Sequence, residues 1–315
     1  MQIDKFTIIL AIAALLPLTG CFTGVESTKA ITRKDVEKVL DTDKESAGAA
    51  KRMLYATRHD SFPDWESGKL FFVTDDNVRL LFAPSATANS SGTDLKGKLL
   101  KYIRFSTYKS IESKDCISIH FSDSNGHEYT IPTNKPISEF RQSGYFYTIP
   151  FLIDMDEIME LRSMLTNKEL YIKTSIWYDA SGKMISGRKF IKITITDILP
   201  GDKVFPYKVR FTDGKSDAYL FMSSEQSSVK NRTYEDLFSE TDIHRRYPDI
   251  SDENWQRIID GDVATDMTRE ECRLALGTPK TIDRRPTYDG LKEYWTYDNG
   301  VYLIFEDGLL RKFRK

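Results

Sequence analysis

From residue 66 onward, much of the chain alternates hydrophobic and polar residues, which is the period of a β-strand with one buried face. In the run 116–122, for example, Ile117, Ile119 and Phe121 share one face. The polar sequence Asp-Ser-Asn-Gly at 123–126 then predicts a turn. The same reasoning predicts a hairpin of strands 70–74 and 78–83, followed by strands 99–106, 116–122 and 128–131.

A second β-rich region follows, and a helix precedes its strands. Asp154 stands at an N-cap position, and Ile158, Leu161 and Leu165 form an apolar stripe of helical period after it. Strands are predicted at 170–178, 190–198, 207–212 and 218–222. The polar segment 223–242 is interpreted as a partly helical linker.

Near the C-terminus, helix caps are followed by another group of strands. Ser251 and Thr268 are N-cap residues, and Glu271 completes a capping box with Thr268. Gly261 and Gly277 stand where the two helices are expected to end. Three strands are predicted after them, at 293–297, 301–305 and 309–313. Two helices against a three-stranded meander can share one core, so residues 250–315 predict an ααβββ domain.

The N-terminus has the pattern of a lipoprotein signal peptide. Lys5 precedes an uncharged apolar run at 6–16, which is too short to anchor a protein across a bilayer. The run ends in Leu-Thr-Gly-Cys at 18–21, which resembles the bacterial lipobox, whose cysteine is acylated before cleavage. We therefore expect removal of residues 1–20, lipidation of Cys21 with fatty acids such as palmitate, and a membrane anchor. A plain secretory signal is the alternative.

These segments together predict a β-rich, multidomain α+β protein of small barrel or sandwich units followed by the C-terminal ααβββ domain. The predicted divisions are a signal peptide at 1–20, a tether with a helical segment at 21–65, and an all-β domain at 66–135. A second β-rich domain with one short helix and a linker occupies 136–245, and the C-terminal domain occupies 250–315. Whether the two β regions are repeats stays open, because their similarity is loose.

The net charge bears on the class of partner, and the cysteine content bears on whether the chain contains a disulfide. The net charge of −2 provides no basic field for nucleic acid. Besides Cys21, the chain has Cys116 and Cys272, which fit ordinary apolar positions. A disulfide between them is permitted in an oxidising compartment and is left open.

Five segments near the C-terminus carry a resemblance to a known family: Ile259-Asp-Gly-Asp-Val263, Met267-Thr-Arg-Glu-Glu271, Leu274-Ala-Leu-Gly-Thr-Pro279, Glu293-Tyr-Trp-Thr-Tyr297 and Tyr302-Leu-Ile-Phe-Glu-Asp-Gly308. Through these segments, about a fifth of the chain resembles the SmpA/OmlA family of small outer-membrane assembly lipoproteins. This resemblance implies an α/β fold, no catalytic residues and binding to a membrane assembly partner. Asp266, where the family usually has Gly, and Cys272, where it has an aliphatic residue, depart from the pattern.

No residue pattern specifies a reaction. Cys116 and His120 share a strand face, but four residues along a strand span about 13 Å, too far for a nucleophile and its base. The four histidines lack zinc-ligand spacing, so neither a metal nor a cofactor is expected. Asp154 and Asp156 are explained more simply by helix capping than by a metal pair.

Aromatic and basic residues of the predicted meander are the candidates for partner contact: Trp295, Tyr297, Tyr302, Arg311 and Arg314. Alternate positions must face the helices, so some of these aromatics belong to the core. The basic residues have a second interpretation as charges that protect an edge strand from aggregation.

The sequence thus predicts a non-enzymatic lipoprotein that acts as a binding or assembly module in the cell envelope, with the outer membrane favoured over the inner one. We expect lipid contact through Cys21 and an envelope protein partner, with no nucleic acid or small-molecule substrate. The alternative is an envelope hydrolase with a site between domains.

Overall fold

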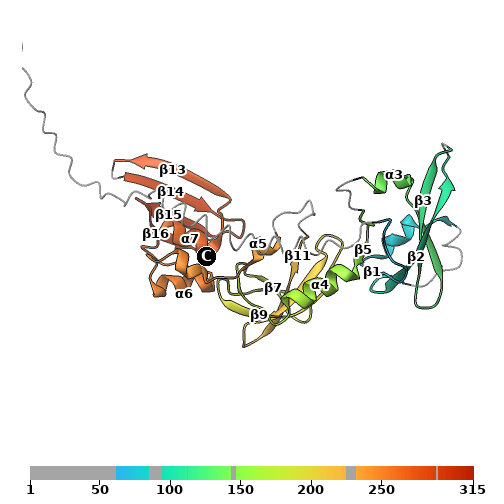
Figure 1. Ribbon diagram of the computed structural model, residues 1–315. Helices are drawn as coiled ribbons and strands as arrows, with labels where there is room; N and C mark the ends of the chain where they lie inside the picture. Colours follow the sequence, from blue (N-terminus) through green and yellow to red (C-terminus); the bar gives the residue numbers. More distant parts are fainter. Residues whose placement is uncertain (1–61, 85–93, 112, 143–146, 225–231, 289) are drawn as a thin grey trace, which may run out of the picture. The chain divides into compact units, whose positions relative to one another are not determined.

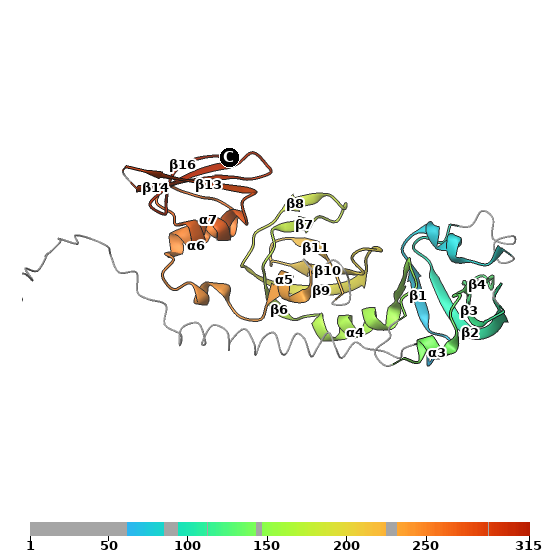
Figure 2. The ribbon, with the colours of Figure 1, turned by 90° about the horizontal axis from the view of Figure 1, so that it is seen from above.

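The computed structural model describes residues 62–84, 94–111, 113–142, 147–224, 232–288 and 290–315 (Figures 1 and 2). The predicted signal peptide, Cys21 and the segment 22–61 lie outside these ranges. The described chain forms three antiparallel sheets with few helices, which confirms the predicted β-rich α+β class.

The first sheet has five strands in the order β4-β3-β2-β1-β5. Its core is rich in aromatic side chains, and Phe62, Phe121 and Tyr129 are among the fully buried ones. Ile117, Ile119 and Phe121 line this core together, as their spacing predicts. The elements are β1 (Leu70–Val73), η1 (Asp76–Leu81), β2 (Leu99–Lys109), β3 (Asp115–Ser122), β4 (Glu128–Pro132), α3 (Ile137–Phe140) and β5 (Leu152–Asp154).

The predicted hairpin at 70–83 is wrong. Its second arm is the 3-10 helix η1, and β1 pairs instead with β2 and β5. Asp75 caps η1 by accepting a hydrogen bond from the backbone N–H of Asn77, and Asp76 accepts two from the backbone N–H groups of Leu95 and Lys96. The local cap from Asp75 favours a helical turn over a second strand, and the two longer-range bonds to Asp76 hold this turn against the segment at 95–96.

The second sheet has seven strands in the order β12-β6-β9-β10-β11-β7-β8. Helix α4 contributes Ile158, Leu161 and Leu165 to the core of this sheet, and Asp154 caps it as predicted. The elements are α4 (Met155–Leu165), β6 (Glu169–Ile172), β7 (Ile176–Tyr178), β8 (Met184–Ser186), β9 (Lys192–Pro200), β10 (Tyr207–Thr212), β11 (Asp217–Met222), α5 (Tyr234–Leu237) and β12 (Phe238–Ser239).

Two predictions for this region need correction. The predicted strand 170–178 is two strands, because β6 pairs with β9 and β12 while β7 pairs with β8 and β11. The segment 223–242 is more than a linker, since it contains α5 and β12. Their residues Tyr234, Leu237 and Phe238 are buried in the second core.

The C-terminal elements are η2 (Ile243–Arg246), α6 (Asp252–Asp260), α7 (Arg269–Leu276), β13 (Thr281–Thr287), β14 (Gly290–Thr296), β15 (Tyr302–Glu306) and β16 (Leu309–Arg314). Ser251 caps α6, the Thr268–Glu271 capping box opens α7, and both helices end at the predicted glycines. Both helices lie on one side of the sheet β13-β14-β15-β16 (Figure 2).

This sheet has four strands, so the predicted ααβββ arrangement misses one. Strand β13 pairs with β14 along its whole length, from Thr281 to Thr287. Its Asp-Arg-Arg-Pro sequence has no hydrophobic alternation, and Pro286 is tolerated because β13 is an edge strand.

All three described sheets are open, with two edge strands each, so the expected small barrels are not formed. The C-terminal core also receives residues that precede α6, including the buried Ile243 and the partly buried Tyr247. Tyr171 and Phe190 of the second β-rich region pack against the same core. Among the described residues, no helix is both long enough and apolar enough to cross a bilayer.

Candidate binding surface

The C-terminal sheet has two unlike faces. On the inner face, Trp295, Leu303 and Phe305 are fully buried in a core that includes Trp255, Ile258 and Cys272 of the helices. The strand register assigns the alternate residues, all half-buried or exposed, to the other side, here called the open face. The open face consists of Thr281, Asp283, Arg285, Lys292, Tyr294, Thr296, Tyr302, Ile304, Glu306, Lys312 and Arg314.

The centre of the open face is aromatic and apolar. The rings of Tyr294 and Tyr302 stack with their centroids 6.3 Å apart and an interplanar angle of 28°. Ile304 lies opposite Tyr294 in the register of β14 and β15. The guanidinium of Arg285 lies over the Tyr294 ring, 4.9 Å from its centroid, which fixes one side of this cluster.

Charged residues surround this centre. Arg285 pairs with Asp283 at 2.6 Å, and Lys292 pairs with Glu306 at 2.9 Å. Lys312 lies opposite Ile304 and Arg314 lies opposite Tyr302 on strand β16. The surface thus has an aromatic centre with a polar rim, the anatomy of many protein interfaces.

The structure separates the predicted aromatic contacts. Trp295 is buried, and its Nε1–H donates a hydrogen bond to Glu293 Oε2 at 3.0 Å, so it is a core residue and not a contact residue. Tyr297 packs against the same core, and burial raises its pKa to about 12. Of the three, only Tyr302 lies on the open face.

The two basic residues predicted as partner contacts, Arg311 and Arg314, lie in different places. Arg311 forms an ion pair with Asp266, in the turn before α7. Arg314 lies on the open face beside Tyr302. The sequence analysis did not single out Tyr294, Ile304 or Lys312. Each is the immediate neighbour of an inner-face residue (Trp295, Leu303 and Phe313), and the alternation of a strand therefore assigns it to the opposite face.

A second polar arrangement lies on the first sheet, around His120. Its Nε2 lies 2.7 Å from Ser106 Oγ, and its Nδ1 lies 3.0 Å from Thr130 Oγ1. Desolvation, with a smaller contribution from Arg104, lowers the pKa of His120. A serine hydroxyl and a histidine ring are thus adjacent, but Nδ1 faces a hydroxyl where a catalytic triad has a carboxylate.

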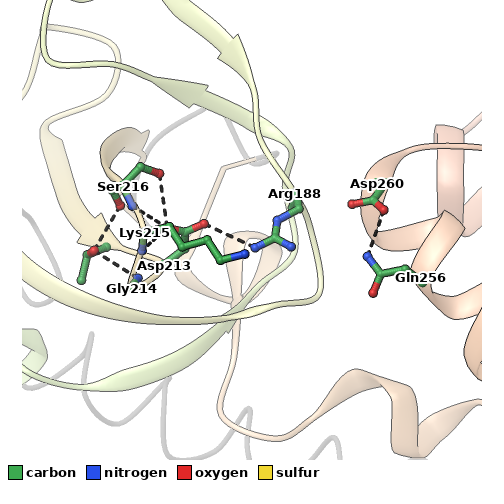
Figure 3. A network of polar contacts seen from close by, with 8 residues as sticks. Arg188, Asp213, Gly214, Lys215, Ser216, Gln256 and Asp260 are labelled. Carbon is green, nitrogen blue, oxygen red and sulfur yellow. Dashed lines mark hydrogen bonds and ion pairs between the residues drawn. The ribbon is translucent and has the colours of Figure 1, made fainter.

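Two further polar clusters serve a turn and a helix surface. Figure 3 shows Asp213, whose Oδ1 accepts hydrogen bonds from the backbone N–H groups of Lys215 and Ser216, while Arg188 lies 3.5 Å from its Oδ2. Burial opposes ionisation of Asp213, but these hydrogen bonds lower its pKa overall. Gln256 and Asp260 form a separate bond within α6 (Figure 3). No group of three or more His, Cys, Asp or Glu in the described part of the chain could hold a metal ion.

Comparisons with protein-family models, with curated proteins and with solved structures gave no significant match. The resemblance to the assembly lipoproteins therefore rests on the sequence segments named above.

Proposed function

We propose that this protein is a non-enzymatic, lipid-anchored binding or assembly module of the cell envelope, and that the open face contacts its protein partner. The observation that supports this most directly is the half-buried cluster of Tyr294, Tyr302 and Ile304 on the side of the sheet opposite its packed core. Helices α6 and α7 pack on the other face, so these two helices leave the cluster open to a partner.

The chemistry of this cluster suits protein recognition. Tyrosine combines a large apolar ring with a hydrogen-bonding hydroxyl and has few side-chain torsions to immobilise. The stacking of Tyr294 on Tyr302 restricts both rings before any partner arrives, which lowers the entropic cost of binding.

The anchoring and location of the protein are proposed from the N-terminal pattern. Lipid on Cys21 would hold the body at a membrane, and the resemblance to assembly lipoproteins favours the outer one. Close to a membrane, the partner would be an envelope protein.

The hydrolase alternative places its site between domains, whereas the Ser106–His120 contact, a hydroxyl beside an imidazole, lies within the first sheet between β2 and β3. We favour binding because Thr130, the Nδ1 partner, cannot stabilise an imidazolium by charge as a carboxylate does. The contacts of His120 are also explained as cross-strand bonds that satisfy polar groups on neighbouring strands.

The proposal is tested by isolating the native lipoprotein with its bound proteins and measuring the affinity of the recovered partner for variants. Tyr302→Ala and Tyr294→Ala should each weaken binding by roughly 1–3 kcal/mol. Tyr288→Ala is the matched control, because Tyr288 is exposed in the turn after β13 and lies outside the open face. Equal affinities for all three variants, with unchanged thermal melting, would contradict the assignment of this face.

A further inference from the structure

The charges of the open face indicate what kind of partner segment it recognises. The face carries four cations, Arg285, Lys292, Lys312 and Arg314. It carries two acids, Asp283 and Glu306, and each of them is paired with a neighbouring cation on the face. Two positive charges therefore remain, and both belong to β16.

The four cations of β16 and of the residue that follows it, Lys315, fall into two groups. Arg311 pairs with Asp266, and the terminal Lys315 pairs with Asp262, both in the segment between α6 and α7. Lys312 and Arg314, between them in sequence, make no ion pair with any described residue. The unmatched cations are thus the two that lie beside Ile304 and Tyr302.

We propose that the open face binds an acidic segment of a protein partner, lying across β15 and β16 with carboxylates opposite Lys312 and Arg314. This inference rests on the proposed function and adds the chemistry of the partner. The apolar side chains of Tyr302 and Ile304 lie between these cations and β14, so apolar contact and charge pairing occur side by side. Complementary charges at a rim set the register of binding and the association rate.

A protein segment fits this face better than an anionic membrane surface does. A membrane presents negative charge to the whole face, including the carboxylates of Asp283 and Glu306, which it would repel. A polypeptide can place its acids opposite β16 alone and keep apolar or neutral residues opposite β13 and β14.

The experiment uses the full-length lipoprotein in its native membrane with a photoreactive amino acid in place of Thr296. This residue lies opposite Tyr302 on the open face, so Lys312 and Arg314 stay intact. We expect a protein adduct whose crosslinked segment, mapped by mass spectrometry, is rich in Asp and Glu. Lys312→Gln with Arg314→Gln should reduce the adduct about tenfold at low salt and by less at high salt.

The matched control is Arg311→Gln with Lys315→Gln, which removes two cations from the same segment, 311–315, but none from the open face. It should leave the adduct yield unchanged, provided that thermal melting shows the domain to be folded. Two outcomes would overturn the acidic-segment inference but leave the proposed binding function intact. In the first, the protein adduct forms equally well without Lys312 and Arg314. In the second, the adduct maps to a segment without acidic residues. An adduct with phospholipid alone would overturn the proposal of a protein segment and would show that the open face contacts the membrane. The absence of any adduct would overturn both proposals for this face.

Discussion

Lys189 is a buried cation for which no carboxylate partner is found among the described residues. It is 9% exposed, and its ammonium group lies over the ring of Phe190 at 5.6 Å from the centroid. Burial lowers the pKa of Lys189 to about 8, since the charged form loses water that the aromatic ring replaces only in part. The charged lysine therefore reduces the stability of the folded chain at neutral pH.

Replacing Lys189 with Met should raise the free energy of unfolding at pH 7, by roughly 1–3 kcal/mol. Between about pH 8 and the ordinary lysine value of 10.5, the unfolded chain holds more protons than the folded chain, so the wild type gains stability as the pH rises. The advantage of the variant should therefore shrink over this window. Urea unfolding at pH 7, 8.5 and 10 measures it, and an advantage that stays constant over the three pH values would refute the assignment.

The predicted lipid anchor depends on a single residue. Cys21→Ser should move the protein from the membrane fraction to the soluble fraction and abolish metabolic labelling with palmitate. Cys116→Ser, which leaves the lipobox unchanged, is the control and should keep the label. Persistent membrane association of the unlabelled Cys21 variant would mean that a protein contact is responsible for anchoring.

At the scale of elements, buried Glu293 connects α7 with two strands. Its side chain is 2% exposed, lies 2.7 Å from Arg269 at the start of α7, and is 3.6 Å from Arg284 on β13. It also accepts the hydrogen bond from the indole of Trp295. The Glu293 carboxylate therefore links the edge strand β13 and helix α7 to strand β14.

Glu293→Gln keeps the shape of the side chain but removes its charge. We expect a loss of roughly 1–2 kcal/mol in the free energy of unfolding, because hydrogen bonds to a charged group are stronger than neutral ones. Glu306→Gln, which breaks the more exposed pair with Lys292, should cost less than about 0.5 kcal/mol. If urea unfolding gave the same loss of free energy of unfolding for both variants, burial of Glu293 would not strengthen its contribution to stability.

Elements with local signals were predicted well, and elements defined by distant contacts were not. The caps at Ser251 and Thr268 act within a few residues, so both C-terminal helices follow directly from the sequence. Strand β13 lacks alternation and depends on pairing with β14. The division of 170–178 into β6 and β7 likewise depends on their different partners, which no local pattern encodes.

The candidate site was predicted only in part, because its residues also depend on a strand register that the sequence does not show. A two-residue period assigns Tyr302 and Trp295 to opposite faces only when the turn at 298–301 is known, because a one-residue shift exchanges the faces. The structure fixes this register by pairing Trp295 with Leu303 and Thr296 with Tyr302. Sequence reasoning could therefore name the aromatics but could not tell which of them are buried.

At the scale of the whole molecule, the described chain contains three hydrophobic cores, each associated with its own sheet. The third core begins before the predicted boundary at residue 250. Ile243 is buried in it, and the His244 ring stacks on Trp255 with centroids 4.4 Å apart. A fragment that starts at 250 removes both contacts.

We therefore expect a fragment 242–315 to unfold cooperatively and at a higher temperature than a fragment 250–315. The difference follows from the lost burial of Ile243 and the lost stacking on Trp255. Circular dichroism melting of the two fragments measures it, with His244→Ala in the longer fragment as the control for stacking alone. Identical melting temperatures would place the domain boundary at 250, and a broad transition for both would mean that Tyr171 and Phe190 are needed as well.

The two cysteines of the folded body, Cys116 and Cys272, are free and buried, one in the first sheet and the other in α7. Burial raises the pKa of the Cys272 thiol to about 12, so the reactive thiolate is scarce while the helix is packed. Cys272 is therefore an internal reporter of the C-terminal core, and its thiol should not react with alkylating reagents until that core opens. Buried Cys116 reports in the same way on opening of the first sheet around β3. In a Cys21→Ser background, the order in which Cys116 and Cys272 are alkylated in rising urea would reveal which part of the molecule unfolds first.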